Sequence, residues 1–152
     1  MMKKSAGILL FKRTQEPLQV LLVHPGGPFF VKKDAGVWSI PKGEFIDDEE
    51  SLVAAKREFF EETGKHVEGP FIPLEPVKLK SGKVIYAWAV ESDFDTSGLK
   101  SNNFSIEWPP KSGLIKEFPE VDKAGWFTIT EAREKISLGQ SQLLDQLILH
   151  LQ

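Results

Sequence analysis

The segment GEFIDDEESLVAAKREFFEETG, residues 43–64, gathers six glutamates and two aspartates in 22 residues. One lysine and one arginine are its only basic residues, although the whole 152-residue chain has a net charge of only −3. Like charges three or four positions apart on a helix repel by about 0.2–0.5 kcal/mol per pair. The segment is therefore either a helix face that water solvates or a face that binds a strongly positive group.

The hydrophobic pattern of this segment predicts a helix. Asp47 and Glu50 have the spacing of a capping box, and Gly64 suits the left-handed turn that commonly ends a helix. Between these ends, apolar residues recur at helical spacing and form one stripe: Leu52, Val53, Ala55, Phe59 and Phe60. We expect this stripe to anchor the helix on a core.

Three glutamates share a different face of the predicted helix. Glu58, Glu61 and Glu62 stand at positions i, i+3 and i+4, so their carboxylates lie about one turn apart. Hard divalent cations such as Mg²⁺ take oxygen ligands and keep waters that substrate phosphates can replace. Before the helix, Gly43 lets the backbone approach a ligand, and the carbonyl of Lys42 or Gly43 offers another oxygen. The pattern indicates a magnesium site, with a solvated helix face as the alternative.

The joint spacing of these residues resembles the Nudix box, the signature of the Nudix hydrolases. Seven identities of the box are present, and an apolar residue fills a further position: Gly43, Glu49, Arg57, Glu58, Glu61, Glu62 and Gly64, with Phe59. One position departs, because the family prefers an aliphatic residue after the last glycine. This chain has Lys65 there, and Val67 is the next apolar candidate. We expect this departure to affect local packing more than chemistry.

The resemblance implies an α+β fold, the Nudix α/β/α sandwich around a central mixed β-sheet, as a single domain over residues 1–152. It also implies a pyrophosphohydrolase that cleaves the diphosphate linkage of a nucleoside diphosphate joined to another group. Glu58, Glu61 and Glu62 would hold Mg²⁺ or Mn²⁺. Arg57 and Glu49 would brace the helix and the preceding loop through charge pairing.

A general base is also expected at the site. Glu58 is one candidate and a downstream loop acid is the other. For the loop acid we favour Glu120, which precedes Trp126 by six residues, a spacing that some family members share for a late metal ligand or base. Glu117 is its rival, and either could be simply an exposed loop acid.

The substrate is indicated by the segment VWSIPKGE, residues 37–44, which is similar to the same region of the family's diadenosine tetraphosphate hydrolases. Lys42 would contact a phosphate. Phe29 or Phe30 would stack on a base, and Lys32 and Lys33 would reach a polyphosphate tail. Alternatively, this loop packs on the core with solvated lysines. Dinucleoside polyphosphates are the first candidate, an NTP- or dNTP-sanitising pyrophosphatase the second, and a nucleotide sensor without catalysis the third.

Composition limits the other classes of function. With 19 basic and 22 acidic side chains, the chain lacks the electrostatic footprint of a duplex nucleic-acid binder. Cysteine is absent, which excludes thiol catalysis and cysteine-bound metal. No stretch approaches the roughly 20 apolar residues that span a bilayer. We expect a cytoplasmic monomer or homodimer that acts on a small-molecule substrate without a membrane or duplex partner.

The remaining elements follow from composition and periodicity. We expect strands over residues 5–13, 18–25, 37–41, 70–80, 83–92 and 123–130, a polar break at 14–17 and a long loop at 26–36. Residues 103–108 are ambiguous between strand and loop, and 109–120 are expected to be loop. Helices are expected over about 130–135 and 140–151, the latter with an apolar inner face of Leu143, Leu144, Leu147, Ile148 and Leu151.

Overall fold

The computed structural model describes residues 3–13 and 17–152. Apart from Pro17, the predicted break at residues 14–17 lies outside the described residues. The helices and strands follow one another as β1 (Lys4–Lys12), β2 (Gln19–Pro25), β3 (Lys42–Phe45), α1 (Ser51–Thr63), β4 (Ile72–Pro73), β5 (Val77–Lys78), β6 (Val84–Glu91), β7 (Asn103–Glu107), β8 (Ile115–Pro119), β9 (Val121–Thr128), α2 (Ile129–Lys135) and α3 (Ser141–His150).

A seven-stranded mixed sheet forms the centre of the fold. Its main order is β4-β6-β1-β2-β9, with β3 paired to β1 and β5 paired to β6. β1 runs parallel to β6 and antiparallel to β2 and β3. Because β1 has neighbours along both edges and helices over both faces, nearly all of its residues are buried.

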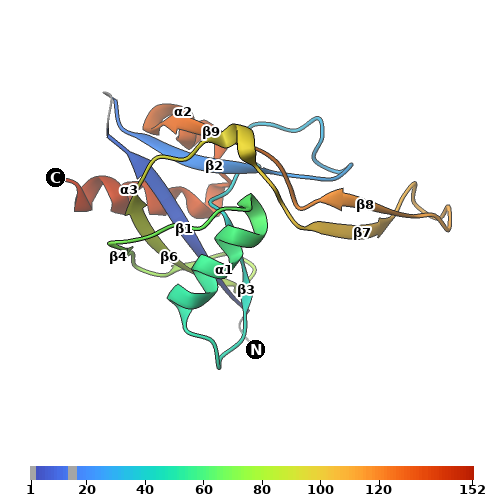
Figure 1. Cartoon of the computed structure of the whole chain (residues 1–152), viewed down its shortest axis with the longest axis horizontal. Helices are drawn as coiled ribbons and strands as arrows, with labels where there is room; N and C mark the ends of the chain where they lie inside the picture. Colours follow the sequence, from blue (N-terminus) through green and yellow to red (C-terminus); the bar gives the residue numbers. More distant parts are fainter. Residues whose placement is uncertain (1–2, 14–16) are drawn as a thin grey trace.

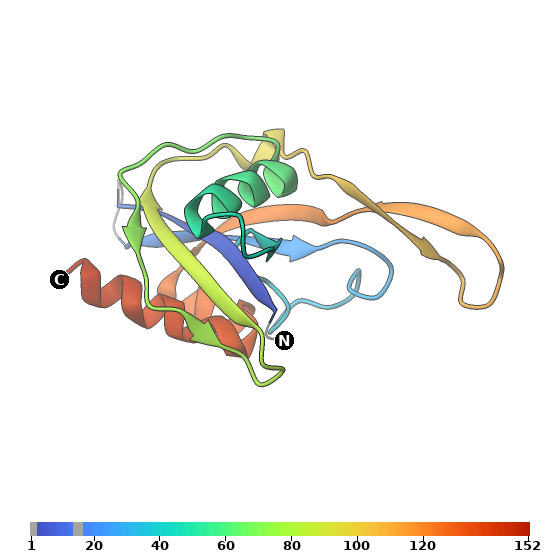
Figure 2. The same ribbon diagram turned by 90° about the horizontal axis from the view of Figure 1, so that it is seen from below.

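Helices cover the two faces of this sheet, α1 on one and α2 with α3 on the other (Figures 1 and 2). Side chains alternate along β1, so Leu9 and Phe11 join the core under α2 and α3, while Ile8 and Leu10 join the core under α1. The predicted α/β/α sandwich with a mixed sheet is confirmed.

Most predicted strands are present, but two expectations about them were wrong. Residues 37–41 form only isolated bridges at Trp38 and Ser39, and the next strand begins at Lys42. The expected strand over 70–80 is reduced to the two-residue strands β4 and β5. Pro73 and Pro76 lack backbone N–H groups, so a continuous ladder cannot form there.

α1 is confirmed as a helix, with corrections at its start and on its apolar face. Glu50 is the N-cap without a side-chain cap bond, and Asp47 pairs with Lys4 instead. Gly64 ends the helix at φ 80°, as expected. Of the predicted apolar stripe, Ala55 and Phe59 are buried as expected, but Val53 and Phe60 are exposed by 54% and 43%. The buried face includes three further residues instead: Ala54, Glu58 and Thr63.

The position after Gly64 shows how the chain accommodates its departure from the box. Val67 is buried in the core under α1 together with Ala54 and Phe59. Lys65 lies across the core edge, with Nζ 4.8 Å from the centre of the Phe94 ring and 2.9 Å from the carbonyl oxygen of Asp95. The apolar role therefore moves to Val67, and Lys65 covers a neighbouring aromatic ring.

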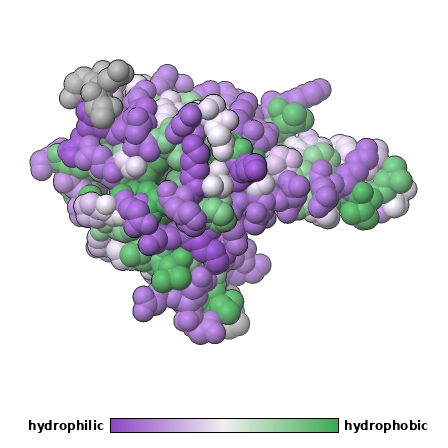
Figure 3. Space-filling model, viewed as in Figure 1, coloured by the Kyte–Doolittle hydropathy of each residue, from purple (hydrophilic) through white to green (hydrophobic). Residues whose placement is uncertain are grey.

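Strands β7 and β8 form an arm that extends away from the body of the molecule (Figures 1 and 2). The segment 103–108, which was ambiguous between strand and loop, contains the strand β7. The expectation of a loop over 109–120 was wrong in part, because β8 lies within it. Phe104 and Phe118 are register partners, and Phe29 packs edge-on against Trp108 with ring centroids 5.3 Å apart. Apolar side chains also lie near the outer end of the arm (Figure 3).

The C-terminal helices agree with expectation. Thr128 and Glu131 form a complete capping box at the start of α2. In α3, Leu143, Leu144 and Leu147 are fully buried, while Ile148 and Leu151 are partly buried. None of the helices in the described part of the chain has both the length and the apolar character needed to cross a membrane.

Candidate active site

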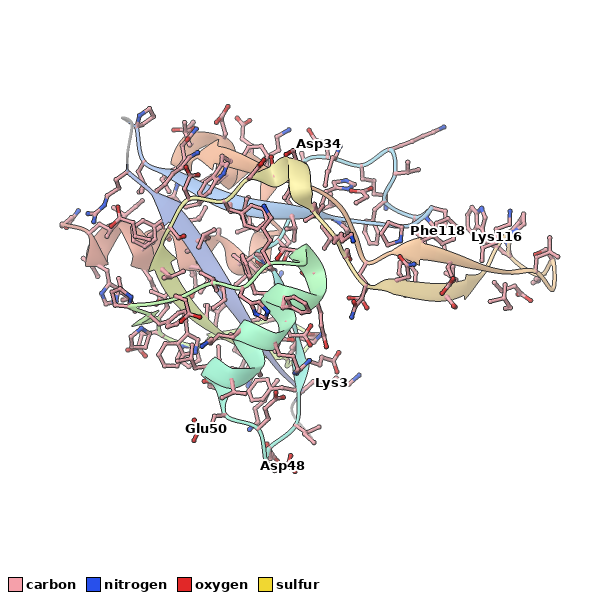
Figure 4. The ribbon with its side chains drawn as sticks, in the orientation of Figure 1. Lys3, Asp34, Asp48, Glu50, Lys116 and Phe118 are labelled. Carbon is pink, nitrogen blue, oxygen red and sulfur yellow. The ribbon has the colours of Figure 1, made fainter. Side chains whose placement is uncertain are left out.

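The acidic segment divides into two groups in space. Asp48 and Glu50 lie at the outer end of the loop that leads into α1 (Figure 4). Glu58, Glu61 and Glu62 lie in the last turns of α1, beside β3. The two groups are separated because the helix rises about 1.5 Å per residue. In the second group, Glu58 and Glu62 contact β3, so this group can form a site between helix and sheet.

Glu58 lies directly against the backbone of β3. A Cβ atom added to Gly43 would stand 1.8 Å from Glu58 Oε1, so only glycine fits at position 43 without moving the glutamate. β3 is held by antiparallel pairing to β1, with Gly43 opposite Ala6. This pairing places Gly43 in a strand. The fixed strand positions a buried carboxylate.

Arg57 connects the loop before α1 to two of the site glutamates. Its Nε and Nη2 atoms donate to the two carboxylate oxygens of Glu49 at 2.9 and 3.0 Å. Its Nη1 donates to Glu58 and, at 3.2 Å, to Glu61 Oε2. These bonds raise the pKa of Arg57, chiefly through Glu49. The structure thus brings together the pair that was expected to brace the site.

Glu62 is turned toward β3 and accepts a hydrogen bond from the backbone N–H of Lys42 at 3.3 Å. Burial raises the pKa of Glu62 to about 8, and the charges of Glu58 and Glu120 add to this rise. Burial also raises the pKa of Glu58, where Arg57 opposes the rise and Glu61 adds to it. The carboxyl groups are therefore close enough to disfavour one another's ionisation.

Glu120 joins this cluster from the junction of β8 and β9. Burial and the charge of Glu61 raise the pKa of Glu120. The rival acid Glu117 lies elsewhere, exposed on the arm opposite Ser105. The structure therefore brings Glu120, and not Glu117, to the glutamates of α1.

A cleft of about 160 Å³ opens beside these acids. Its polar wall contains Lys42, Glu62 and Glu120. Burial lowers the pKa of Lys42, and the nearby Lys83 adds to this effect. The rest of the cleft is formed by side chains of β2, of the segment before β3 and of β9: Val23, Pro25, Val37, Ser39 and Val121. Lys42 is thus in a position to meet a group that the carboxyls also contact.

The other predicted substrate residues do not line this cleft. Lys32 is exposed, and the ammonium group of Lys33 lies 5.6 Å from the centre of the Phe30 ring. The carbonyl oxygen of Lys33 bonds the buried ring of His24 at 2.7 Å. Phe30, Lys32 and Lys33 do not line the cleft with Lys42, so their role as a binding group stays a prediction.

The donor set fits a divalent cation in its chemistry, though its side chains are not yet arranged around one. Among residues 3–13 and 17–152, no three His, Asp or Glu side chains are grouped as a ready metal site. Glu58 and Glu61 are instead turned toward Arg57. However, the carboxyls of Glu58, Glu61 and Glu62 on α1 lie near that of Glu120. A divalent cation would relieve the repulsion from Glu58 and Glu120, which adds to burial in raising the pKa of Glu62.

Two positioning residues escaped the sequence analysis. The side-chain oxygen of Gln140 accepts the backbone N–H of Ile40 at 3.1 Å and so holds the segment that leads into Lys42. The backbone N–H of Asn102 donates to the carbonyl oxygen of Glu61 in α1 at 2.7 Å. The carbonyl oxygen of Asn102 accepts a hydrogen bond from the backbone N–H of Glu120 at 2.8 Å. Neither contact has a local sequence signal, since each joins segments far apart in the chain.

Fold and site together define a class: an α+β protein whose mixed sheet and flanking helix present a carboxylate cluster suited to phosphate chemistry. The family comparison makes this specific, because the NUDIX domain model matches residues 1–147. The chain belongs to the NUDIX family. With its complete set of box acids, this membership makes it a hydrolase of the phosphoric-anhydride class. No curated protein matches the chain significantly.

Solved structures agree on the fold. The NUDIX domain of Shewanella oneidensis NrtR complexed with ADP ribose superposes with a TM-score of 0.68 at 20% identity, covering 100% of this chain and 90% of that one. A C. elegans Ap4A hydrolase binary complex superposes with a TM-score of 0.65 at 19% identity, with 97% of each chain covered. A mutT/nudix family protein from Listeria innocua superposes with a TM-score of 0.63 at 16% identity, covering 98% of this chain and 93% of that one. At these identities the likeness concerns the fold alone.

Proposed function

We propose that this protein is a metal-dependent pyrophosphohydrolase that cleaves the diphosphate linkage of a nucleotide-type substrate, with dinucleoside polyphosphates first among the candidates. The observation that carries the proposal is the convergence of Glu58, Glu61, Glu62 and Glu120 beside Lys42. Burial raises the pKa of Glu58, Glu62 and Glu120, and the charges of neighbouring glutamates add to each rise. A site of this kind suits Mg²⁺ or Mn²⁺ together with a phosphate chain.

In this proposal Glu58, Glu61 and Glu62 hold the cation, and the carbonyl of Gly43 is available as a further oxygen ligand. The cation supplies positive charge for the diphosphate oxygens and makes water more acidic. Lys42 binds a phosphate oxygen from the wall of the cleft. Arg57 connects Glu49 in the loop before α1 to Glu58 and Glu61 on the helix, so that loop and helix keep a fixed relation to each other.

Glu120 takes the proton of the attacking water in this scheme. Burial raises the pKa of Glu120. The pKa therefore lies nearer to neutral pH, and the carboxylate is a better proton acceptor. Its backbone N–H is bonded to Asn102, so the side chain starts from a fixed point at the edge of the cluster. Glu58 is the alternative base, but its bond to Arg57 occupies one carboxylate oxygen.

The proposed substrate class is supported by similarity to an Ap4A hydrolase and to a NUDIX domain complexed with ADP ribose. Both of these ligands carry a phosphate chain between two organic groups. Phe30, Lys32 and Lys33 stay candidates for substrate contact, and they would have to approach the cleft from the loop at residues 26–36. Cytoplasmic location, the absence of a duplex nucleic-acid partner and a monomeric or homodimeric state stay predictions from composition.

The proposal is tested by a coupled phosphate-release assay over dinucleoside polyphosphates, NTPs, dNTPs and ADP-ribose, with and without Mg²⁺ or Mn²⁺. We expect turnover that requires the metal and is fastest on a dinucleoside polyphosphate. Preference for NTPs or dNTPs would favour the sanitising role. Nucleotide binding without turnover by well-folded protein would favour a sensor and contradict the proposal. Reaction in ¹⁸O-labelled water would then identify the phosphorus that is attacked.

A further inference from the structure

A second hollow lies on the outer side of α1. It has a volume of about 530 Å³ and is formed by side chains of α1, the segment that follows it and the root of the arm: Lys56, Arg57, Phe60, Glu61, His66 and Asn102. Glu61 belongs both to this hollow and to the carboxylate cluster. The hollow therefore opens directly beside the proposed reaction centre, on a side different from the cleft that contains Lys42.

An exposed aromatic pair forms part of its wall. Phe60, which is 43% exposed, stacks on the ring of His66 with centroids 4.4 Å apart and an interplanar angle of 14°. A large apolar ring on a solvent-facing helix position loses the stabilisation that burial would give it. A planar aromatic ring from a ligand would cover this pair and gain stacking energy that does not depend on the identity of the base.

The charges around the pair favour a ring attached to a phosphate chain. Arg57 is occupied by Glu49, Glu58 and Glu61, so it offers little attraction to a ligand. Lys56 pairs with none of these acids, and its Nζ lies 5.5 Å from the centre of the Phe71 ring. It can turn toward an anion at the rim of the hollow, where the phosphate chain would leave the carboxylate cluster.

We infer that this hollow binds the planar aromatic group at the second end of the substrate, so that the enzyme acts on phosphoanhydrides that carry a ring system on both sides. This inference rests on the proposed function. The scissile diphosphate lies at Glu58, Glu61 and Glu62. One end of the substrate enters the cleft beside Lys42, and the other end stacks on Phe60 and His66. A nucleoside triphosphate has only one ring and leaves one of the two hollows empty.

The test compares diadenosine tetraphosphate with ATP as substrates of the wild type and of Phe60→Ala. Wild-type enzyme should favour the tetraphosphate. The ratio of kcat/KM for the tetraphosphate to that for ATP should fall about tenfold in Phe60→Ala. It should recover in Phe60→Tyr, which keeps a ring for stacking. Val53→Ala is the matched control, because Val53 is also exposed on α1 but does not line the hollow.

A ratio that is unchanged in Phe60→Ala, or a wild-type preference for ATP, would overturn the inference and leave the pyrophosphohydrolase proposal standing. Binding is measured separately by the ring-proton shifts of His66 in the Glu62→Gln variant, with Mg²⁺ present. Diadenosine tetraphosphate should move these signals more than ATP does, and equal shifts would contradict the inference. A clear shift in the variant, together with no turnover by the wild type, would support the binding site and contradict the proposed hydrolysis.

Discussion

Gly43 and Glu58 are in direct contact across the interface of β3 and α1, with no room for a side chain between them. A Cβ at residue 43 would stand 1.8 Å from Glu58 Oε1 and 2.1 Å from the carboxyl carbon. Glu58 is buried, so its carboxylate cannot simply swing into water. The glycine therefore determines where one acid of the cluster lies.

Gly43→Ala should displace the Glu58 carboxylate and lower kcat by about 100-fold, since displacement of a reacting group by about 1 Å has effects of this size. We expect a lower melting temperature as well, because the new methyl group is overpacked. Glu44→Ala is the control, as Glu44 is the next residue of β3 and its exposed side chain pairs with Lys83. A Gly43→Ala enzyme with wild-type kcat would show that the position of Glu58 is unimportant.

Glu62→Gln should lower kcat by orders of magnitude while raising the melting temperature of the metal-free protein. The folded-state pKa of Glu62 is about 8 and its ordinary value is 4.5. A raised pKa stabilises the fold at low pH, and this stabilisation is lost as pH rises through the folded value. The difference between variant and wild type should therefore be small near pH 4.5 and reach a few degrees near pH 8.

Thermal melts in EDTA across this pH range measure that difference. Gln can still accept the backbone N–H of Lys42 through its amide oxygen, so the bond at 3.3 Å need not be lost. Glu68→Gln, a change at an exposed residue, serves as the control and should leave the melting profile close to that of the wild type. A constant difference at every pH would mean that the charge of Glu62 is not the cause.

The sequence was most informative where periodicity or a spaced set of residues carries the signal. The apolar runs of the strands, the helix at α1, the inner face of α3 and the set Glu58, Glu61 and Glu62 are all local patterns. The exposure of Val53 and Phe60 on α1 was missed because both are as apolar as residues that do pack. Their exposure depends on where β1 and β6 lie, which no local pattern contains.

Long-range pairing explains the other differences. β8 was expected to be loop because residues 109–120 are rich in proline, glycine and charge, but pairing with β7 forms a strand there. Gln140 reaches Ile40 across 100 residues. Asn102 connects Glu61 to Glu120 through main-chain bonds that any residue with an N–H and a carbonyl could make. Such contacts depend on the assembled fold and leave no spacing to detect.

Arg57→Lys should reduce kcat and weaken the fold, although the charge is kept. The guanidinium reaches both oxygens of Glu49 and, through Nη1, Glu58 and Glu61. An ammonium group lacks this planar fork and cannot make the same set of bonds. We expect kcat to fall about tenfold or more. A double-mutant cycle with Glu49→Gln should give a coupling of about 1 kcal/mol in urea unfolding, and additive effects would exclude the bracing role.

Removal of the arm should leave the body of the protein folded. Neither core cluster contains a residue of β7 or β8, and a two-stranded hairpin contributes little stability by itself. Replacing residues 104–118 with a short glycine linker should therefore change the melting temperature by only a few degrees, provided that Asn102 and Glu120 keep their main-chain bond. Hydrogen exchange should nevertheless rise in the loop at residues 26–36, because Phe29 loses its contact with Trp108. Unfolding of the whole chain on this deletion would show that the arm supports the sandwich, and unchanged exchange at Phe29 and Phe30 would show that the arm does not hold the loop.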